Sequence, residues 1–163
     1  MKTLLLVRHA KSSWNIAGES DFDRSLNGRG KTDAPEMASR LIKRNVQIDL
    51  FVASPAKRAR KTAEIFIREY HRDGKEILFV QELYEAELQT FYDLISGLKN
   101  DYHSVAIFGH NPIITDFAND LTDRQVDSIP TCGIFALSIP IEKWKGFAGS
   151  EKNFLFFDYP KGG

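Results

Sequence analysis

The chain has 163 residues, a length that suits one domain with a sizeable buried core. Its 22 Lys and Arg residues equal its 22 Asp and Glu residues, so the formal net charge is zero. This balance argues against nucleic-acid binding, which needs a basic face to neutralise phosphates. We therefore expect a single domain over residues 1–163, with any positive potential confined to a local site.

The sequence also bears on the cellular compartment. The single cysteine, Cys132, cannot form an internal disulfide and precedes the apolar run 133–137, so we expect it to be buried in a reducing compartment. The apolar run 3–7 is too short for a signal peptide, and no segment approaches the roughly 18 apolar residues of a membrane span. These features favour a cytoplasmic protein that does not bind membranes.

Short apolar runs alternate with segments of helical periodicity, a pattern typical of an α/β fold. We expect strands near 3–8, 49–53, 76–80, 103–109, 132–140 and 153–158, and helices near 33–45, 55–71, 88–99 and 112–121. The first helix has two candidate starts. A cap at Asn27 would leave Pro35 inside the helix, where proline removes a hydrogen bond. A start near Asp33, with Glu36 completing a capping box, avoids that cost and is the one we prefer.

The second helix is expected to begin with Ser54 as N-cap and Pro55 as the first helical residue. Its inward-facing positions recur at helical spacing. They are Ala59, Thr62, Ala63, Phe66, Ile67 and Tyr70. Arg58 lies in the first turn, where a cation gains nothing from the helix dipole. Two interpretations stay open: Arg58 binds an anion together with the helix end, or it is an ordinary surface arginine.

Three predicted strand ends carry cationic or imidazole side chains. Arg8 and His9 follow the run 3–7, His110 follows the run 104–108, and Arg58 comes shortly after the run 50–53. In open α/β sheets, ligands bind beyond the carboxyl ends of the strands. This composition suits an anion that a histidine attacks, and phosphate is the obvious candidate. The long segment that leaves His9 and runs to residue 32 is also a candidate functional loop.

Other patterns are less informative. Residues 28–32 end like a phosphate-binding loop, but Ser25 stands where that motif needs a glycine. The acidic pair in 21–23 resembles that of aspartate-nucleophile phosphatases, but no buried strand precedes it. No Cys pair or His-x-x-x-His spacing indicates zinc. His71 and His103 are interpreted as solvated surface histidines.

Together, the motifs resemble the histidine phosphatase superfamily, which has the phosphoglycerate mutase-like fold. Residues 8–15 read RHAKSSWN, 54–63 read SPAKRARKTA, 109–112 read GHNP, and 23–26 read DRSL. Their form is most similar to the SixA-type phosphohistidine phosphatases, and Ala10 replaces the glycine usual in the superfamily. The resemblance extends from residue 4 to about residue 140 and implies a three-layer α/β/α sandwich with a mostly parallel central sheet.

The resemblance also implies the site residues. His9 would be the nucleophile that forms a phosphohistidine, while Arg8 and Arg58 would hold the phosphoryl oxygens. His110 would donate a hydrogen bond to the phosphate, and Asn15 would add a neutral donor. The chemistry would need no metal and no cofactor. A non-catalytic phosphate-binding module is the alternative class, but such a module has little need for an intact nucleophile.

The general acid is the open position. Larger family members place a glutamate in a Leu-x-Glu element, which Leu83 and Glu85 match, with Glu82 and Glu87 as neighbouring alternatives. An equally good interpretation is that this cluster is a solvated loop.

Weak acid machinery favours phosphohistidine as the substrate, because imidazole leaves more easily than an alkoxide. The expected partner is therefore a phosphorylated protein, such as a histidine phosphotransfer domain. A small phosphate monoester is the alternative substrate. A monomer is the favoured oligomeric state.

Overall fold

The computed structural model describes residues 1–14 and 17–162. A six-stranded sheet lies at its centre, with the strand order β3-β2-β4-β1-β5-β6. The strands are β1 (Lys2–Arg8), β2 (Leu50–Ala53), β3 (Leu78–Phe79), β4 (Ser104–Gly109), β5 (Ile134–Ile139) and β6 (Asn153–Asp158). The first four strands are parallel, whereas β5 and β6 add two antiparallel pairings. The mostly parallel sheet expected from the sequence is confirmed.

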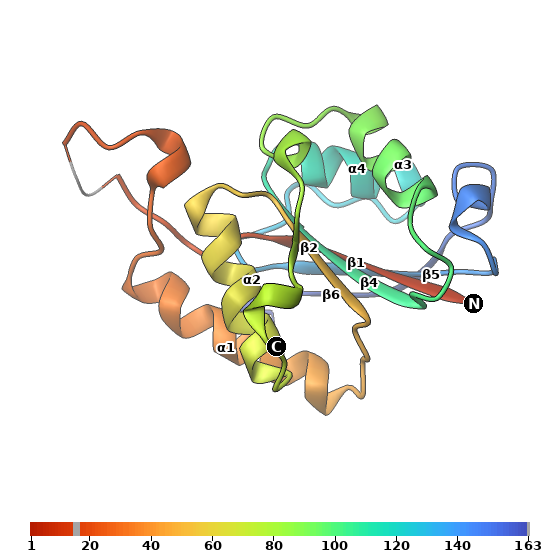
Figure 1. Cartoon of the computed structure of the whole chain (residues 1–163), viewed down its shortest axis with the longest axis horizontal. Helices are drawn as coiled ribbons and strands as arrows, with labels where there is room; N and C mark the ends of the chain where they lie inside the picture. Colours follow the sequence, from red (N-terminus) through yellow and green to blue (C-terminus); the bar gives the residue numbers. More distant parts are fainter. Residues whose placement is uncertain (15–16, 163) are drawn as a thin grey trace.

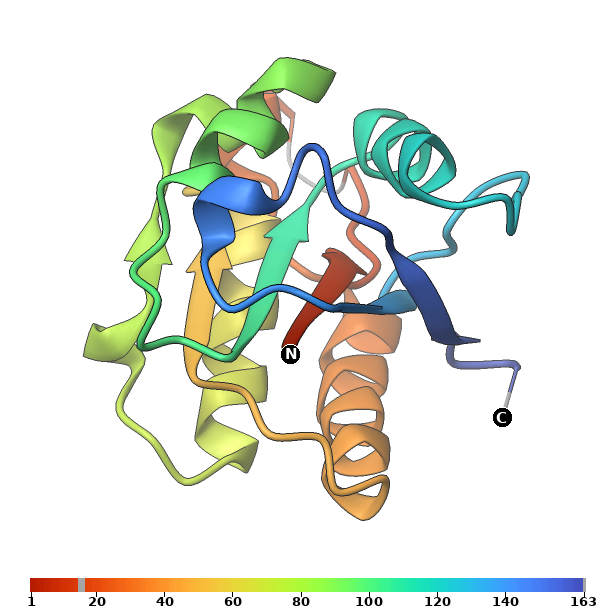
Figure 2. The ribbon, with the colours of Figure 1, turned by 90° about the vertical axis from the view of Figure 1, so that its right-hand side faces the viewer.

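Helices cover both faces of this sheet (Figures 1 and 2). The helices α1 (Gly28–Lys43) and α2 (Lys57–Glu69) lie on one face, and α3 (Leu88–Ser96) and α4 (Ile113–Leu121) lie on the other. Short 3-10 turns occur at η1 (Asp21–Asp23), η2 (Gly74–Glu76), η3 (Gln81–Leu83) and η4 (Trp144–Gly146). This arrangement is the predicted three-layer sandwich, and the predicted strands lie within about two residues of the observed ones.

The side chains of β1 point alternately to the two faces of the sheet, and both faces are covered by helices, which explains the unbroken apolar run in its sequence. Leu5 and Val7 pack into the core beneath α1 and α2, whereas Leu4 and Leu6 pack into the core beneath α3 and α4. A parallel strand covered on both faces needs apolar residues at every position. Since β1 pairs with β4 on one side and β5 on the other, its carboxyl end is held at the middle of the sheet.

The preferred start of the first helix was wrong. The helix begins at Gly28, because the Asn27 side chain accepts a hydrogen bond from the Gly30 amide at 2.9 Å. Gly30 allows the helix end to sit against the backbone of Lys11, where any Cβ would collide with the Lys11 carbonyl. Pro35 lies inside the helix. Its one missing hydrogen bond is offset by the cap and by burial of the helix's apolar face.

The predicted cap of the second helix was also wrong. The helix begins at Lys57, and the residue at its N-cap, Ala56, makes no side-chain cap hydrogen bond. Ser54 instead uses its hydroxyl to contact His110, as described below. The inward stripe is confirmed from Ala59 to Ile67, while Tyr70 is only half-buried. Cys132 is fully buried, as expected. No helix in residues 1–14 and 17–162 is long and apolar enough to span a membrane.

The cap at the start of α1 leads to a stability prediction. Replacing Asn27 with alanine removes the side-chain acceptor for Gly30 and is expected to lower the free energy of unfolding by about 1 kcal/mol. Urea denaturation monitored by circular dichroism measures this loss. The control is Lys31→Ala, which changes an exposed residue of the same helix and is expected to leave stability nearly unchanged. Equal stability of the Asn27→Ala and wild-type proteins would contradict the assigned cap.

Candidate functional site

The two predicted active-site histidines follow neighbouring strand ends. In the parallel pairing of β1 with β4, Arg8 lies opposite Gly109, so His9 and His110 emerge side by side. The His9 amide donates to the carbonyl oxygen of Gly109 at 3.1 Å, and the two imidazole ring centres are 5.3 Å apart. Both side chains are more than nine-tenths buried. Residues 101 positions apart in the chain thus form one pocket wall.

Arg58 joins this pair from the start of α2. Its Nε donates to His9 Nε2 at 3.3 Å, and the side chain is almost completely buried. Thr62, one turn further along α2, fixes the geometry: its hydroxyl accepts from the Ala10 amide at 2.9 Å and donates to the Arg58 carbonyl at 2.7 Å. Of the two interpretations left open for Arg58, the structure excludes the surface arginine.

The segment before β5 holds the end of β1 in place. Cys132 adopts a left-handed backbone conformation with a φ of 61°, and its amide donates to the carbonyl oxygens of both Arg8 and His9. Arg8 in turn donates from Nη1 to the Ile129 carbonyl at 3.0 Å. These contacts aim the Arg8 guanidinium and the His9 ring into the same cleft.

The partners of His9 define which ring nitrogen carries its proton. Nδ1 lies 2.7 Å from the carbonyl oxygen of Ala10, which only accepts hydrogen bonds, so Nδ1 is the protonated nitrogen. Nε2 faces the Nε–H of Arg58, which only donates. The unprotonated nitrogen with its lone pair is therefore Nε2, and it points into the cleft beside a guanidinium.

Both histidines are held neutral. Burial lowers the pKa of His9 to about 3 and outweighs the hydrogen bond to Ala10, which acts to raise it; neighbouring His110, Arg58 and Arg8 lower it further. Burial, with Arg58 as the next cause, lowers the pKa of His110 to about 4. Because these values lie below that of an unfolded histidine, near 6.5, acidification below about pH 6.5 favours the unfolded chain, which takes up protons that the native rings do not.

One ring nitrogen of His110 has a hydrogen-bond partner and the other has none among the described residues. Its Nε2 lies 2.8 Å from the hydroxyl of Ser54, and that hydroxyl accepts a hydrogen bond from the Ala56 amide. The hydroxyl proton is then available for His110 Nε2, which favours the form of His110 protonated at Nδ1. This Nδ1 is buried and has no partner among the described residues. It is a donor without an acceptor, on a residue that lines the cleft beside His9.

Two residues at the site were not assigned a role from the sequence, Asp21 and Tyr84. The Asp21 carboxylate accepts from Arg58 Nη2 at 3.0 Å and from the Tyr84 hydroxyl at 2.6 Å, and its carbonyl accepts from Arg58 Nη1. Burial acts to raise the pKa of Asp21, but the hydrogen bonds from Tyr84 and Arg58 outweigh it and lower the pKa below its usual value. The length of the loop after His9 marked it as functional, but no periodicity shows which of its residues turns inward.

Arg24 adds a third guanidinium. Its Nε lies 3.3 Å from a carboxylate oxygen of Asp21 as an ion pair, without the alignment of a hydrogen bond. Its planar group stacks over the exposed ring of Trp14 at 4.3 Å. The sequence placed Arg24 within the DRSL motif but gave it no role.

These side chains surround an open cleft of about 620 Å³. The residues that line it are Arg8, His9, Lys11, Ser12, Asp21, Arg24, Arg58, His110, Asn111 and Thr131. In the described part of the chain, four buried side-chain nitrogen or oxygen atoms lack a hydrogen-bond partner, and all four belong to this lining. They are Arg8 Nε, Ser12 Oγ, Arg24 Nε and His110 Nδ1. Buried polar groups are normally paired, so this concentration indicates a binding site for a group rich in hydrogen-bond acceptors.

Two of the predicted site residues are not found here. Glu85 is exposed and lines a separate depression with Glu82 and Glu87, so the structure does not bring it to the cleft. The neighbouring Tyr84, rather than Glu85, reaches the site. Asn15 lies outside the described residues.

A comparison of the sequence with known protein families identifies the family of this chain. The model of the histidine phosphatase superfamily (branch 1) matches residues 4–96, which is more than half of the chain. The chain belongs to this superfamily. The match includes the segments that carry His9 and Arg58, while His110 lies beyond it.

Two curated proteins are similar to part of this chain. A probable 2-carboxy-D-arabinitol-1-phosphatase of Arabidopsis thaliana is 36% identical over 58% of this chain and 19% of its own length. A 2,3-bisphosphoglycerate-dependent phosphoglycerate mutase of Bartonella bacilliformis is 32% identical over 61% of this chain and 48% of its own length. The chain thus spans about half or less of the length of these curated relatives.

A solved structure from Agrobacterium tumefaciens, described as a "putative phosphohistidine phosphatase SixA", aligns over nearly the whole fold. It is 27% identical, covers 98% of both chains, and superposes with a TM-score of 0.83. The phosphoglycerate mutase-like fold expected from the sequence is confirmed.

The hydrogen-bond partners of His9 lead to a spectroscopic prediction. At pH 5 we expect a neutral His9 ring protonated at Nδ1 and a neutral His110 ring, because burial holds both pKa values at about 4 or below. Long-range ¹H–¹⁵N NMR correlation spectra report both charge and tautomer, with the exposed His71 and His103 as internal references. A positively charged His9 at pH 5, or one protonated at Nε2 instead, would contradict the assignment.

Proposed function

We propose that this protein hydrolyses a phosphorylated substrate through a covalent phosphohistidine at Nε2 of His9. The observation that carries the proposal is the His9 ring itself: its Nδ1 is tied to the Ala10 carbonyl, and its Nε2 lone pair faces a cleft lined with cations. A neutral imidazole is a competent nucleophile, and covalent catalysis divides one difficult displacement into two easier ones. The depressed pKa keeps the ring neutral throughout the physiological range.

In the first step, the Nε2 lone pair attacks phosphorus and the bond from phosphorus to the leaving group breaks. Arg58 and Arg8 neutralise charge on the three equatorial oxygens, and a planar guanidinium pairs well with such oxygens. Nδ1 of His110 donates to one of these three oxygens. The leaving group takes its electron pair with it and acquires a proton from solvent or from a group on the substrate.

In the second step, water attacks the phosphorus of phosphorylated His9. The P–N bond breaks, Nε2 recovers its lone pair, and inorganic phosphate is released with the proton of the attacking water passing to solvent or base. The ionised Asp21 is the only carboxylate among the described residues that line the cleft. It is a base rather than an acid, and it restrains the Arg58 side chain.

The preferred substrate is phosphohistidine displayed on a protein, for instance on a histidine phosphotransfer domain, because of the chemistry of its leaving group. An imidazole leaving group needs less protonation than an alkoxide, and the carboxylate at the described cleft is ionised. Glu85, the candidate acid, is exposed outside the cleft. The open cleft suits a side chain presented by a partner, and the similarity to the SixA structure over 98% of the chain supports the same choice.

A small phosphate monoester is the second candidate substrate. The curated relatives favour it, because the names of the Arabidopsis and Bartonella proteins refer to small phosphorylated metabolites. Their identity with this chain, 36% and 32%, exceeds that of the SixA structure. The two candidates share the same His9 chemistry and differ in what departs from phosphorus.

The role of Arg58 is tested by its removal. Arg58→Ala is expected to lower kcat for an aryl phosphate by about 10²–10³, because a preorganised donor to the transition state is lost. Arg58→Lys keeps the charge without the planar fork and is expected to fall between that variant and the wild type. The matched control is Arg68→Ala, on the exposed face of the same helix. Near-wild-type turnover by folded Arg58→Ala protein would refute the role.

The choice of substrate is tested by comparative kinetics. We expect kcat/KM for a phosphohistidine-bearing phosphotransfer domain to exceed that for every member of a panel of alkyl and sugar phosphates. His9→Gln is expected to abolish turnover of both substrate types and to prevent labelling of the protein by ³²P. If the esters are hydrolysed faster than the phosphoprotein, the second candidate replaces the first. Label found on another residue would overturn the nucleophile.

A further inference from the structure

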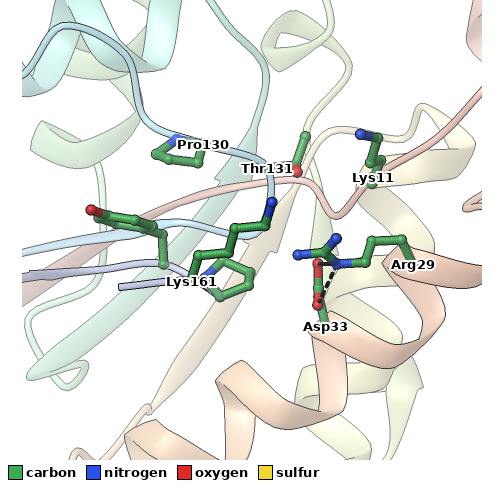
Figure 3. Close-up of a pocket in the computed structure, with 8 residues that line it drawn as sticks. Lys11, Arg29, Asp33, Pro130, Thr131 and Lys161 are labelled. Carbon is green, nitrogen blue, oxygen red and sulfur yellow. Dashed lines mark hydrogen bonds and ion pairs between the residues drawn. The ribbon is translucent and has the colours of Figure 1, made fainter. Parts of the chain in front are cut away.

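A second pocket adjoins the cleft and shares two of its lining residues, Lys11 and Thr131. It has a volume of about 260 Å³, slightly below the roughly 300–1,000 Å³ of typical ligand pockets, which is ample room for one anionic group. Its lining comes from four segments: the segment after β1, the start of α1, the segment before β5, and the tail after β6. The residues are Lys11, Arg29, Asp33, Pro130, Thr131, Tyr159, Pro160 and Lys161 (Figure 3).

Three cations and one carboxylate line this pocket. The carboxylate, Asp33, is buried, and Arg29 donates to both of its oxygens at 3.1 and 3.2 Å. In contrast, neither Lys11 nor Lys161 forms an ion pair with any carboxylate in residues 1–14 and 17–162. Figure 3 shows the Lys161 side chain reaching across the pocket toward Arg29. The pocket therefore carries a net positive charge in a chain whose formal net charge is zero.

The pocket walls are fixed by hydrogen bonds. The carbonyl oxygen of Lys11 accepts a hydrogen bond from the Asn27 amide at 3.0 Å. Gly30 packs against the Lys11 backbone at the same place. On the other side, Arg40 pairs with Asp158 and donates to the carbonyl oxygens of residues 159 and 160. This anchor ties the C-terminal tail to α1 and sets the position of Lys161. The cations thus stand on a preorganised frame, which lowers the entropic cost of binding.

We propose that this pocket binds a second anionic group of the substrate, a carboxylate or a phosphate, while the scissile phosphoryl group occupies the cleft at His9. The proposal rests on the function proposed above and specifies its substrate class: molecules with two anionic groups. The shared wall of Lys11 and Thr131 makes the two binding positions adjacent. The second anion belongs either to a small bisphosphate or phospho-acid, or to an acidic residue beside a phosphohistidine in a protein.

Lys161 provides the test, because it lines the second pocket and does not line the cleft. One arm compares the bisphosphates of propanediol, butanediol, pentanediol and hexanediol with the corresponding monophosphates. The other arm compares phosphohistidine peptides that carry Glu or Gln beside the phosphohistidine. In at least one arm, the doubly anionic substrate is expected to have the higher kcat/KM. Lys161→Ala is expected to reduce that advantage about tenfold, the loss of one charge-assisted contact.

Phenyl phosphate, which has no second anion, provides the baseline. Lys161→Ala and the control Lys145→Ala, which alters an exposed lysine on η4, are both expected to hydrolyse it at the wild-type rate. An effect in the diol arm identifies a small-molecule source, and an effect in the peptide arm identifies a protein source. No preference in either arm, or an equal loss on phenyl phosphate, would overturn the second site. If His9→Gln leaves phenyl phosphate hydrolysis unchanged, the proposed function itself fails.

Discussion

The hydrogen bond from Nδ1 of His9 to the carbonyl oxygen of Ala10 is the interaction on which the site depends. It spans one residue and is 2.7 Å long, and it leaves the lone pair on the opposite nitrogen. The backbone on either side of it is fixed from three directions. The Gly109 carbonyl oxygen accepts a hydrogen bond from the His9 amide, and the Cys132 amide donates one to the His9 carbonyl oxygen. The Thr62 hydroxyl accepts a hydrogen bond from the Ala10 amide. The ring of a nucleophile so restrained is already oriented, and before attack its Nε2 has only to give up the hydrogen bond from Arg58.

The electrostatics of the cleft follow from the close packing of its arginine and histidine side chains. Burial and neighbouring Arg58 both lower the pKa of Arg8, and the guanidinium groups together disfavour a charged imidazole. Asp21 compensates part of this excess by pairing with Arg58 and Arg24. Clustering of like charges costs stability, and such costs are common where a site is preorganised for a charged ligand. A phosphoryl group, with several acceptors and negative charge, offsets both the repulsion and the unpaired donors.

The sequence predicted those parts of the structure that depend on local patterns. Apolar runs marked the strands, and the rule that parallel strands present their carboxyl ends together predicted that His9 and His110 converge. Local rules failed where a tertiary contact outweighed them. The proline penalty at Pro35 was overridden by the Asn27 cap, and the Ser54 hydroxyl turned to His110 instead of the helix.

Other site features had no local signal. Asp21 and Tyr84 meet across 63 positions, and neither periodicity nor motif spacing encodes that pairing. The Leu-x-Glu match pointed to Glu85, yet it is the hydroxyl of Tyr84 that reaches Asp21 at the edge of the cleft. Likewise, Lys161 reaches the second pocket only because Arg40 anchors the tail after β6. Such positions depend on long-range packing, which a single sequence does not display.

A crystal structure with orthovanadate would show whether Nε2 of His9 is the atom that attacks phosphorus among the cations of the cleft. Vanadate adopts the five-coordinate geometry of phosphoryl transfer when a nucleophile bonds to it. We expect a vanadium–Nε2 bond to His9, with the equatorial oxygens contacted by Arg8, Arg58 and Nδ1 of His110. Vanadate bound away from His9, or bonded to any other side chain, would contradict it.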